Sequence, residues 1–244
     1  MMPTFKISRV AAVLTLPLAA ACVSRPPTVA HVHIGHAVTG VHVTPNKEGY
    51  MVTAQRRASE AIDYATKAQS ATDLKEIQQD IVQSNQATNA KDYFGVKESL
   101  TMAVNHISFA ATSDDASLNV QKSAPVFAAD SARVLERCDL IELLSKDVAA
   151  SSSTSEAMVS VGEIVKLSQS NLFGEDSNGD GKVGSVPSQY GLVQLKAELD
   201  AMIARESPPY VTVDQWYLFN LVRLPNGKWV FDKLGRGGII EGYK

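Results

Sequence analysis

The chain has 244 residues, of which 45% are hydrophobic and 20% are charged, and its net formal charge is −3. This much apolar side chain offsets the ordering entropy of a folded core, which excludes a collagen-like, mucin-like or wholly disordered chain. The 23 basic residues nearly balance the 26 acidic residues, so no broad positive field is available to hold a nucleic acid. Two cysteines are too few for a disulfide scaffold or a four-thiolate zinc site.

Residues 1–21 have the features of a signal peptide. Lys6 and Arg9 precede an apolar run that is shorter than the roughly 20 residues of a membrane-spanning helix. This run ends in three alanines, and Cys22 follows. Residues 18–22 (Leu-Ala-Ala-Ala-Cys) resemble the lipobox of bacterial lipoproteins, with the Leu one position earlier than usual. The resemblance implies a lipid anchor on Cys22 in the cell envelope, at the outer membrane facing the periplasm, with simple secretion as the alternative.

The mature chain divides into three parts by composition. Residues 22–49 contain several prolines and glycines and no helical periodicity, so we expect the lipidated Cys22 and a His-rich tether there. Residues 50–206 are rich in Ala, Gln, Lys and Glu, which is typical of helices. The aromatic-rich tail 207–244 is expected to pack on the helices, and Pro-Asn-Gly-Lys at 225–228 is typical of a β-hairpin turn.

The apolar spacing in the central part follows the helical period. Helices are predicted at 51–69, 73–89, 92–111, 126–150, 155–172 and 187–206. Short connections favour antiparallel neighbours, so the predicted fold is mainly α, an antiparallel helical bundle with one helix–loop–helix unit over residues 155–206.

The most specific motif is Asp-Ser-Asn-Gly-Asp-Gly-Lys-Val at residues 176–183, which resembles the first two thirds of an EF-hand calcium loop. Ca²⁺ takes six to eight oxygen ligands, and alternate residues of such a loop point to one centre. The expected ligands are the side chains of Asp176, Asn178 and Asp180, the backbone carbonyl of Lys182 and, through a water, Gly184.

The pattern departs from the EF-hand at position twelve, where Pro187 replaces a bidentate Glu. Three interpretations remain open. The loop binds Ca²⁺ weakly, or it binds nothing and is an ordinary Asx-rich turn. In the third, a displaced group completes the ligand set: Glu175, Gln189 or Glu198.

Four of the five histidines lie within twelve residues: His31, His33, His36 and His42. Imidazoles are suitable ligands for Zn²⁺ and Cu²⁺, so this segment is the alternative metal site. Two other interpretations remain open: the histidines belong to a solvated tether, or they form hydrogen bonds with the helical bundle. The fifth, His106, lies beside a predicted apolar stripe and is expected to pack there. Residues 33–40 also resemble the opening of uncharacterised proteobacterial exported helical proteins with one EF-hand-like loop, a resemblance that implies no known activity.

The sequence lacks a nucleophile elbow, a P-loop, a dinucleotide fingerprint and a zincin motif, so we do not expect an enzyme. The expected function is a lipid-anchored envelope protein that binds one Ca²⁺ in a structural or partner-binding role. The alternative is a protein that binds or delivers Zn²⁺ or Cu²⁺ through the His31–His42 segment. A third possibility is a structural envelope protein for which the ion is incidental. The expected partners are the membrane, through the anchor, and an envelope protein, but no nucleic acid.

Overall fold

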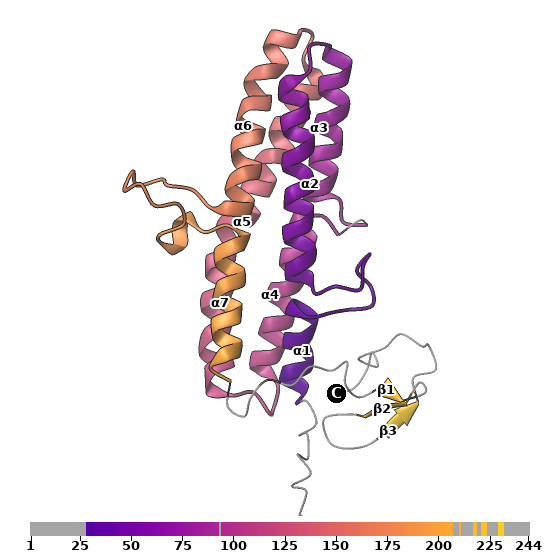
Figure 1. Ribbon diagram of the computed structural model, residues 1–244, viewed down its shortest axis with the longest axis vertical. Coiled ribbons are helices and arrows are strands. Elements are labelled where there is room, and N and C mark those ends of the chain that lie inside the picture. The colour runs from indigo at the N-terminus through magenta and orange to yellow at the C-terminus, as the bar shows by residue number, and fades with distance from the viewer. Residues whose placement is uncertain are drawn as a thin grey trace, which may run out of the picture.

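The computed structural model describes residues 28–92 and 94–206, Tyr210, and the backbone of three short strands, and it shows a mainly helical bundle (Figure 1). The prediction of a mainly α fold is therefore confirmed. The described helices are α1 (Val29–Val38), α2 (Tyr50–Ser70), α3 (Leu74–Asn89), α4 (Val96–Thr112), α5 (Leu118–Ala150), α6 (Thr154–Phe173), the 3₁₀ turn η1 (Pro187–Gln189) and α7 (Leu192–Ala204).

The bundle is built from columns of helices that run antiparallel to their neighbours (Figure 1). Three columns contain two helices each, α1 with α2, α3 with α4, and α6 with α7, and the fourth is α5 alone. Helix α5 has 33 residues, a length of about 50 Å at 1.5 Å per residue. It packs against α3, α4, α6 and α7, so it is the helix along which the rest of the bundle is aligned.

Two adjoining clusters of buried apolar side chains form the core. One lies among α1, α4, α7 and the first halves of α2 and α5, and the other among α3, α6 and the second halves of α2 and α5. From residue 54 onward, every buried residue of α2 is an alanine: Ala54, Ala58, Ala61, Ala65 and Ala68. Such small side chains let neighbouring helices approach closely.

Helix α1 corrects the prediction that residues 22–49 are an irregular tether. Val29–Val38 is helical, with Ala30, Ile34 and Ala37 buried in the core. Its first turn is capped from a distant segment, because the Asp115 carboxylate accepts hydrogen bonds from the backbone N–H of Val29 (2.7 Å) and Ala30 (3.0 Å). These contacts replace the intrahelical partners that the first N–H groups of a helix lack.

Two predicted boundaries are also wrong. Helix α5 begins at Leu118 rather than 126, because Ser117 caps its first turn and Val120 is buried, so Pro125 lies inside the helix instead of before it. The segment predicted as one helix over 187–206 is the short turn η1 followed by α7. Gly191 separates them, and a Cβ there would lie 2.3 Å from the backbone N of Gly174.

Three strands, β1 (Tyr217–Leu218), β2 (Leu221–Arg223) and β3 (Trp229–Phe231), form an antiparallel sheet in that order. The predicted turn at 225–228 and the predicted signal peptide with Cys22 lie outside the described residues. In the part of the chain that the structure describes, no helix has the length and apolarity needed to cross a membrane.

Candidate metal sites

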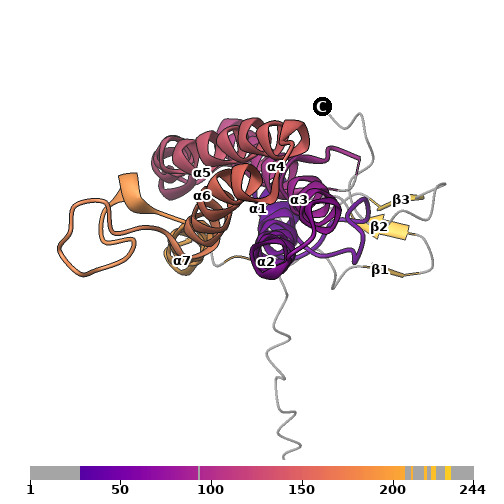
Figure 2. The ribbon, with the colours of Figure 1, turned by 90° about the horizontal axis from the view of Figure 1, so that it is seen from above.

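The predicted calcium loop lies between α6 and α7, where residues 174–191 project away from the bundle (Figures 1 and 2). Asn178 and Asp180 are exposed and Asp176 is half-buried. Helix α7 continues the column of α6, so the two helices flank the loop end to end (Figure 1).

The loop wraps around the carboxylate of Asp176. Its Oδ1 accepts a hydrogen bond from the backbone N–H of Asp180 (3.1 Å), and its Oδ2 accepts one from Gly181 (2.9 Å). Asn178 Oδ1 also accepts from Asp180 N–H, at 3.2 Å. Gly179 and Gly181 have positive φ angles of 71° and 78°, which glycine adopts without a steric cost. The fold thus brings together the three side chains that the sequence selects.

Asp180 turns back toward the second half of the loop. Its Oδ1 accepts from the backbone N–H of Lys182 (2.8 Å), and this hydrogen bond is the main cause of a pKa below the ordinary value of an aspartate. The Ser185 hydroxyl lies 3.1 Å from Asp180 Oδ2 and 3.0 Å from Oε1 of Gln189. Gln189 is fully buried, so Ser185 links the exposed carboxylate to a fixed amide.

The groups considered for the missing ligand lie in different places. Pro187, at position twelve, is in η1. Glu198 is on α7 and hydrogen-bonds to Asp130 of α5. Glu175 contacts Arg137, whose Nη2 is 2.9 Å from Glu175 Oε1. Among the proposed replacements, Gln189 is therefore the one connected to the loop carboxylates.

Arg137 fixes both ends of the loop to α5. Its side chain is fully buried, and Nη1 donates to the backbone carbonyls of Ser170 (3.2 Å) and Tyr190 (2.8 Å). The backbone of Glu175 adds hydrogen bonds to Gly184 and Gln189, each 2.9 Å. The base of the loop is thus held in place while its tip is exposed.

A second set of groups comes together at the interface of α1 and α4. Nδ1 of His33 lies 3.1 Å from Nδ1 of His106, and the centroids of these rings are 5.3 Å apart. The centroid of His36 lies 4.9 Å from that of His106 and 6.4 Å from that of His33. The sequence did not identify His106 as part of this cluster, since its partners are about 70 residues earlier in the chain.

The other two histidines of the predicted segment are not among these ring contacts. Nε2 of His31 is 3.1 Å from Oε2 of Glu206, and both side chains are buried. Glu206 also accepts hydrogen bonds from Ser117 and Asn119, each 2.6 Å. His42 is half-buried in the connection from α1 to α2. The predicted set of four histidines is therefore not brought together as one group.

The clustered histidines are held in their neutral form. Burial lowers the pKa of His36 to about 3, assisted by the nearby rings of His106, His33 and His42. Burial and then His33 lower the pKa of His106 to about 4. Burial also lowers the pKa of His33, whereas the negative charge of Asp115 acts in the opposite direction and raises it. The Nδ1 atom of His36 is buried and has no hydrogen-bond partner.

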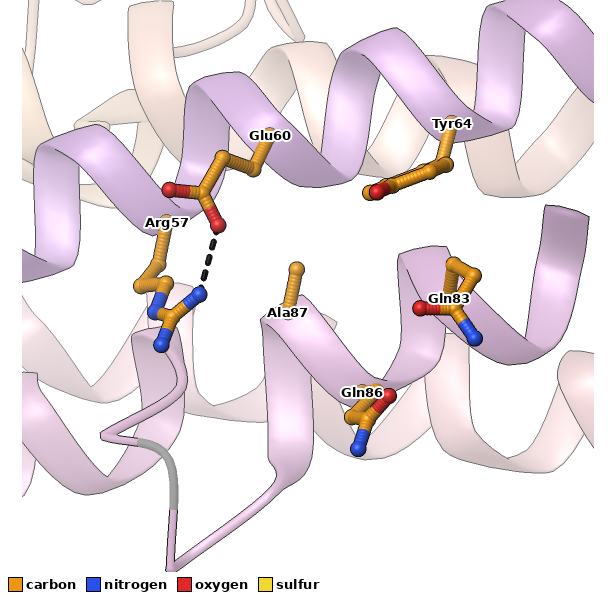
Figure 3. Close-up of a pocket in the computed structure, with 6 residues that line it drawn as sticks. All are labelled: Arg57, Glu60, Tyr64, Gln83, Gln86 and Ala87. Atoms are coloured by element: carbon orange, nitrogen blue, oxygen red, sulfur yellow. Dashed lines mark hydrogen bonds and ion pairs between the residues drawn. The ribbon is translucent and has the colours of Figure 1, made fainter.

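Two hollows lie on the described surface. An open groove of about 910 Å³ borders the histidine cluster, with His33, Phe109 and Asp115 among its lining residues. A smaller polar hollow of about 210 Å³ lies between α2 and α3 (Figure 3). There Arg57 points to Glu60, with Nη1 2.6 Å from Oε2, so its two charged lining groups neutralise each other.

Cys138 shows none of the features of a reactive thiol. It is fully buried, and burial raises its pKa to about 12. Across residues 28–92, 94–206 and 210, no group of three or more His, Cys, Asp or Glu side chains is arranged so that it could hold a metal ion. Comparisons with family models, curated proteins and solved structures find no match for this chain.

Proposed function

We propose that this protein is a lipid-anchored envelope protein that binds one Ca²⁺ ion in the loop between α6 and α7. The observation that supports it best is the position of the Asp176 carboxylate, which the loop encircles through the N–H groups of Asp180 and Gly181. Asn178 Oδ1 accepts from the same N–H group of Asp180, so the side chains of Asp176 and Asn178 are held close together, and Ca²⁺ would take the place of these N–H groups as the partner of their oxygens.

The proposed ligand set contains two carboxylates, one amide oxygen and one backbone carbonyl, with a water-mediated contact at Gly184. The donors are Asp176, Asp180, Asn178 and Lys182. Ser185 and Gln189 stand beside Asp180 as the groups through which the remaining coordination would be completed. With few charged ligands and no bidentate Glu, the affinity expected is weak, with Kd of ~10⁻⁴ to 10⁻³ M as in extracellular modules.

The ion has a structural role in this proposal. Arg137 already fixes the loop ends to α5, so bound Ca²⁺ would order the exposed tip between two fixed points. An ordered tip that projects from the bundle suits contact with another envelope protein. The lipid on Cys22 would hold the protein at the membrane, six residues before the first residue that the structure describes.

The test is calorimetric titration of Ca²⁺ into the purified protein and into Asp176→Ala/Asp180→Ala. We expect saturable one-site binding that the double substitution abolishes. At a Ca²⁺ concentration 100 times Kd, linkage predicts that the parent protein gains about 2.7 kcal/mol of stability and the variant gains none.

The matched control is Asp147→Ala/Glu163→Ala, which removes two exposed carboxylates from α5 and α6 with the same change in net charge. It is expected to bind as the parent does. If the loop variant retains parental affinity, the loop assignment is wrong. If a protein partner is recovered equally well with and without a chelator, the ion is incidental to that partner.

A further inference from the structure

We infer that His33, His36 and His106 bind one divalent transition-metal ion, of the class of Zn²⁺ and Cu²⁺, between α1 and α4. The proposal is independent of the calcium loop and uses a different set of histidines from the one the sequence suggests. His33 and His36 lie three residues apart on one side of α1, and His106 faces them from α4.

The two closest nitrogen atoms are already spaced as metal ligands. A tetrahedral ion with bonds of about 2.0–2.1 Å to nitrogen places two such nitrogens about 3.3 Å apart. The Nδ1 atoms of His33 and His106 are 3.1 Å apart. In the metal-free protein one of these atoms must carry the proton that the two share. A bound ion would take the place of that proton, which would move to Nε2 of the same ring.

The ring positions point to His36 as the third ligand. Three imidazoles on one tetrahedral ion have ring centroids about 5 Å apart, from the same bond length. Two of the three observed separations, 5.3 and 4.9 Å, agree with this value. The third, 6.4 Å between His33 and His36, is longer, so a turn of the His36 side chain is needed to complete the set.

The surroundings of His36 favour that turn. Its Nδ1 is buried with no hydrogen-bond partner, which is unfavourable for a polar atom removed from water. A bond to a metal would satisfy it.

The structure also provides access and support. His33 lines the open groove, through which a hydrated ion would reach the cluster and a water would occupy the fourth position. The Tyr50 ring stacks on His106 with centroids 5.3 Å apart, which fixes the orientation of that imidazole. A bound ion would therefore join α1 to α4 at their shared interface.

The experiment uses the full chain, purified in detergent and without a histidine tag. Co²⁺, a spectroscopic substitute for Zn²⁺, is titrated while visible absorption is recorded, and Zn²⁺ is then added in competition. We expect one ion per chain with the intense absorption of tetrahedral Co²⁺, displaced by Zn²⁺. His33→Gln and His106→Gln should each weaken binding by at least about 100-fold, since loss of a direct ligand exceeds the 10–100-fold typical of an outer-shell partner.

His42→Gln is the matched control, because His42 is half-buried on the neighbouring connection but is not a proposed ligand. It should bind Co²⁺ within a few-fold of the parent. The Asp176→Ala/Asp180→Ala protein should do so as well, which separates this site from the calcium loop. His33 is half-buried, and the unfolding transition of His33→Gln without metal checks that the variant is folded.

A second measurement tests the geometry directly. In ¹⁵N NMR spectra, Zn²⁺ is expected to shift the Nδ1 resonances of both His33 and His106 and to leave both rings with the proton on Nε2, so that the ring with Nδ1–H in the metal-free protein changes tautomer. The proposal is overturned by any of three results: no tetrahedral Co²⁺ spectrum, loss of binding in His42→Gln equal to that in His106→Gln, or coordination through Nε2 of His33 and His106.

Discussion

Arg137 places a positive charge inside the bundle, where its side chain has no exposed surface. Its partners are two backbone carbonyls and the carboxylate of Glu175. Burial alone would raise the pKa of Glu175, but the hydrogen bond and charge of Arg137 outweigh it and hold that pKa below its ordinary value. One side chain thus joins α5 to the end of α6 and the start of α7.

We predict that Arg137→Met lowers the free energy of unfolding by about 3–5 kcal/mol, the usual effect of breaking a buried pair from one side. The carbonyl of Tyr190 loses the Arg137 donor, and the carbonyl of Ser170 keeps only the N–H of Gly174. Glu175 keeps only the longer contact with Arg133. Arg137→Lys should lose less, because an ammonium keeps the charge but lacks the planar donor fork. Chemical denaturation of the three proteins measures both differences.

The control is Arg133→Met, which removes the other arginine near Glu175. Arg133 is 45% exposed and its Nε is 3.5 Å from the carboxylate, so its loss should cost less than about 1 kcal/mol. Equal losses for the two arginines would show that burial of Arg137 does not matter.

The residues of the proposed calcium loop could be identified from the sequence because they lie close together in the chain. Asp176, Asn178 and Asp180 lie within five residues, and glycines supply the turns between them. The histidine cluster could not be found in this way. His106 meets His33 only because α1 packs on α4, and no spacing in the sequence encodes that contact.

At the scale of helices, α5 and α7 share a pair of carboxyl groups. Glu198 hydrogen-bonds to Asp130, and its pKa is raised to about 7 by burial and then by the charge and hydrogen bond of Asp130. Burial raises the pKa of Asp130 as well. Burial and the charge of Asp130 therefore favour the protonated form of Glu198 where α7 packs on α5.

This pair predicts a pH dependence of stability. A raised pKa means that the folded state binds the proton more tightly than the unfolded chain. The contribution of Glu198 is therefore fully present below pH 4.5 and is lost as the pH rises through about 7. Glu198→Gln should reduce the difference in unfolding free energy between pH 5 and pH 8 by about 1 kcal/mol, a value limited by solvent screening.

Denaturation of both proteins at the two pH values provides the measurement. Asp200→Asn is the control on the same helix, since Asp200 is exposed and pairs with Lys196. It should leave the pH dependence as in the parent. An unchanged pH dependence in Glu198→Gln would contradict the assignment.

The helices themselves were predictable to different degrees. Helices α2, α3 and α6 lie within two residues of their predicted bounds, because each has a regular apolar stripe and clear end signals. Helix α1 has no such stripe. Thr28 caps it locally, but the N–H groups of Val29 and Ala30 are satisfied by Asp115, about 86 residues away, and its burial depends on α4, so tertiary contacts add what the local pattern lacks.

At the scale of the whole molecule, the spacing between columns depends on the alanines of α2. Ala65 is fully buried in the cluster that includes Ile77 and Val161, on α3 and α6. A larger side chain at this position would push these helices apart, because protein interiors have few voids to accept it.

We predict that Ala65→Leu lowers the free energy of unfolding by about 1–3 kcal/mol, although leucine is a good helix former. Thr66→Leu, at the next and exposed position, should change it by no more than about 0.5 kcal/mol. Thermal and denaturant unfolding of both variants gives the comparison. A neutral result for Ala65→Leu would mean that the columns have room to separate.

The distant contacts of α1 also order events during synthesis. A ribosome makes this helix before the other described helices, yet its capping carboxylate, Asp115, emerges 86 residues later. Glu206, whose carboxylate pairs with His31, emerges 175 residues after that histidine. Since chains emerge N-terminus first, α1 must wait, with its apolar side uncovered, while α2 to α4 are made. The helix synthesised earliest among those described is thus among the last to reach its final contacts.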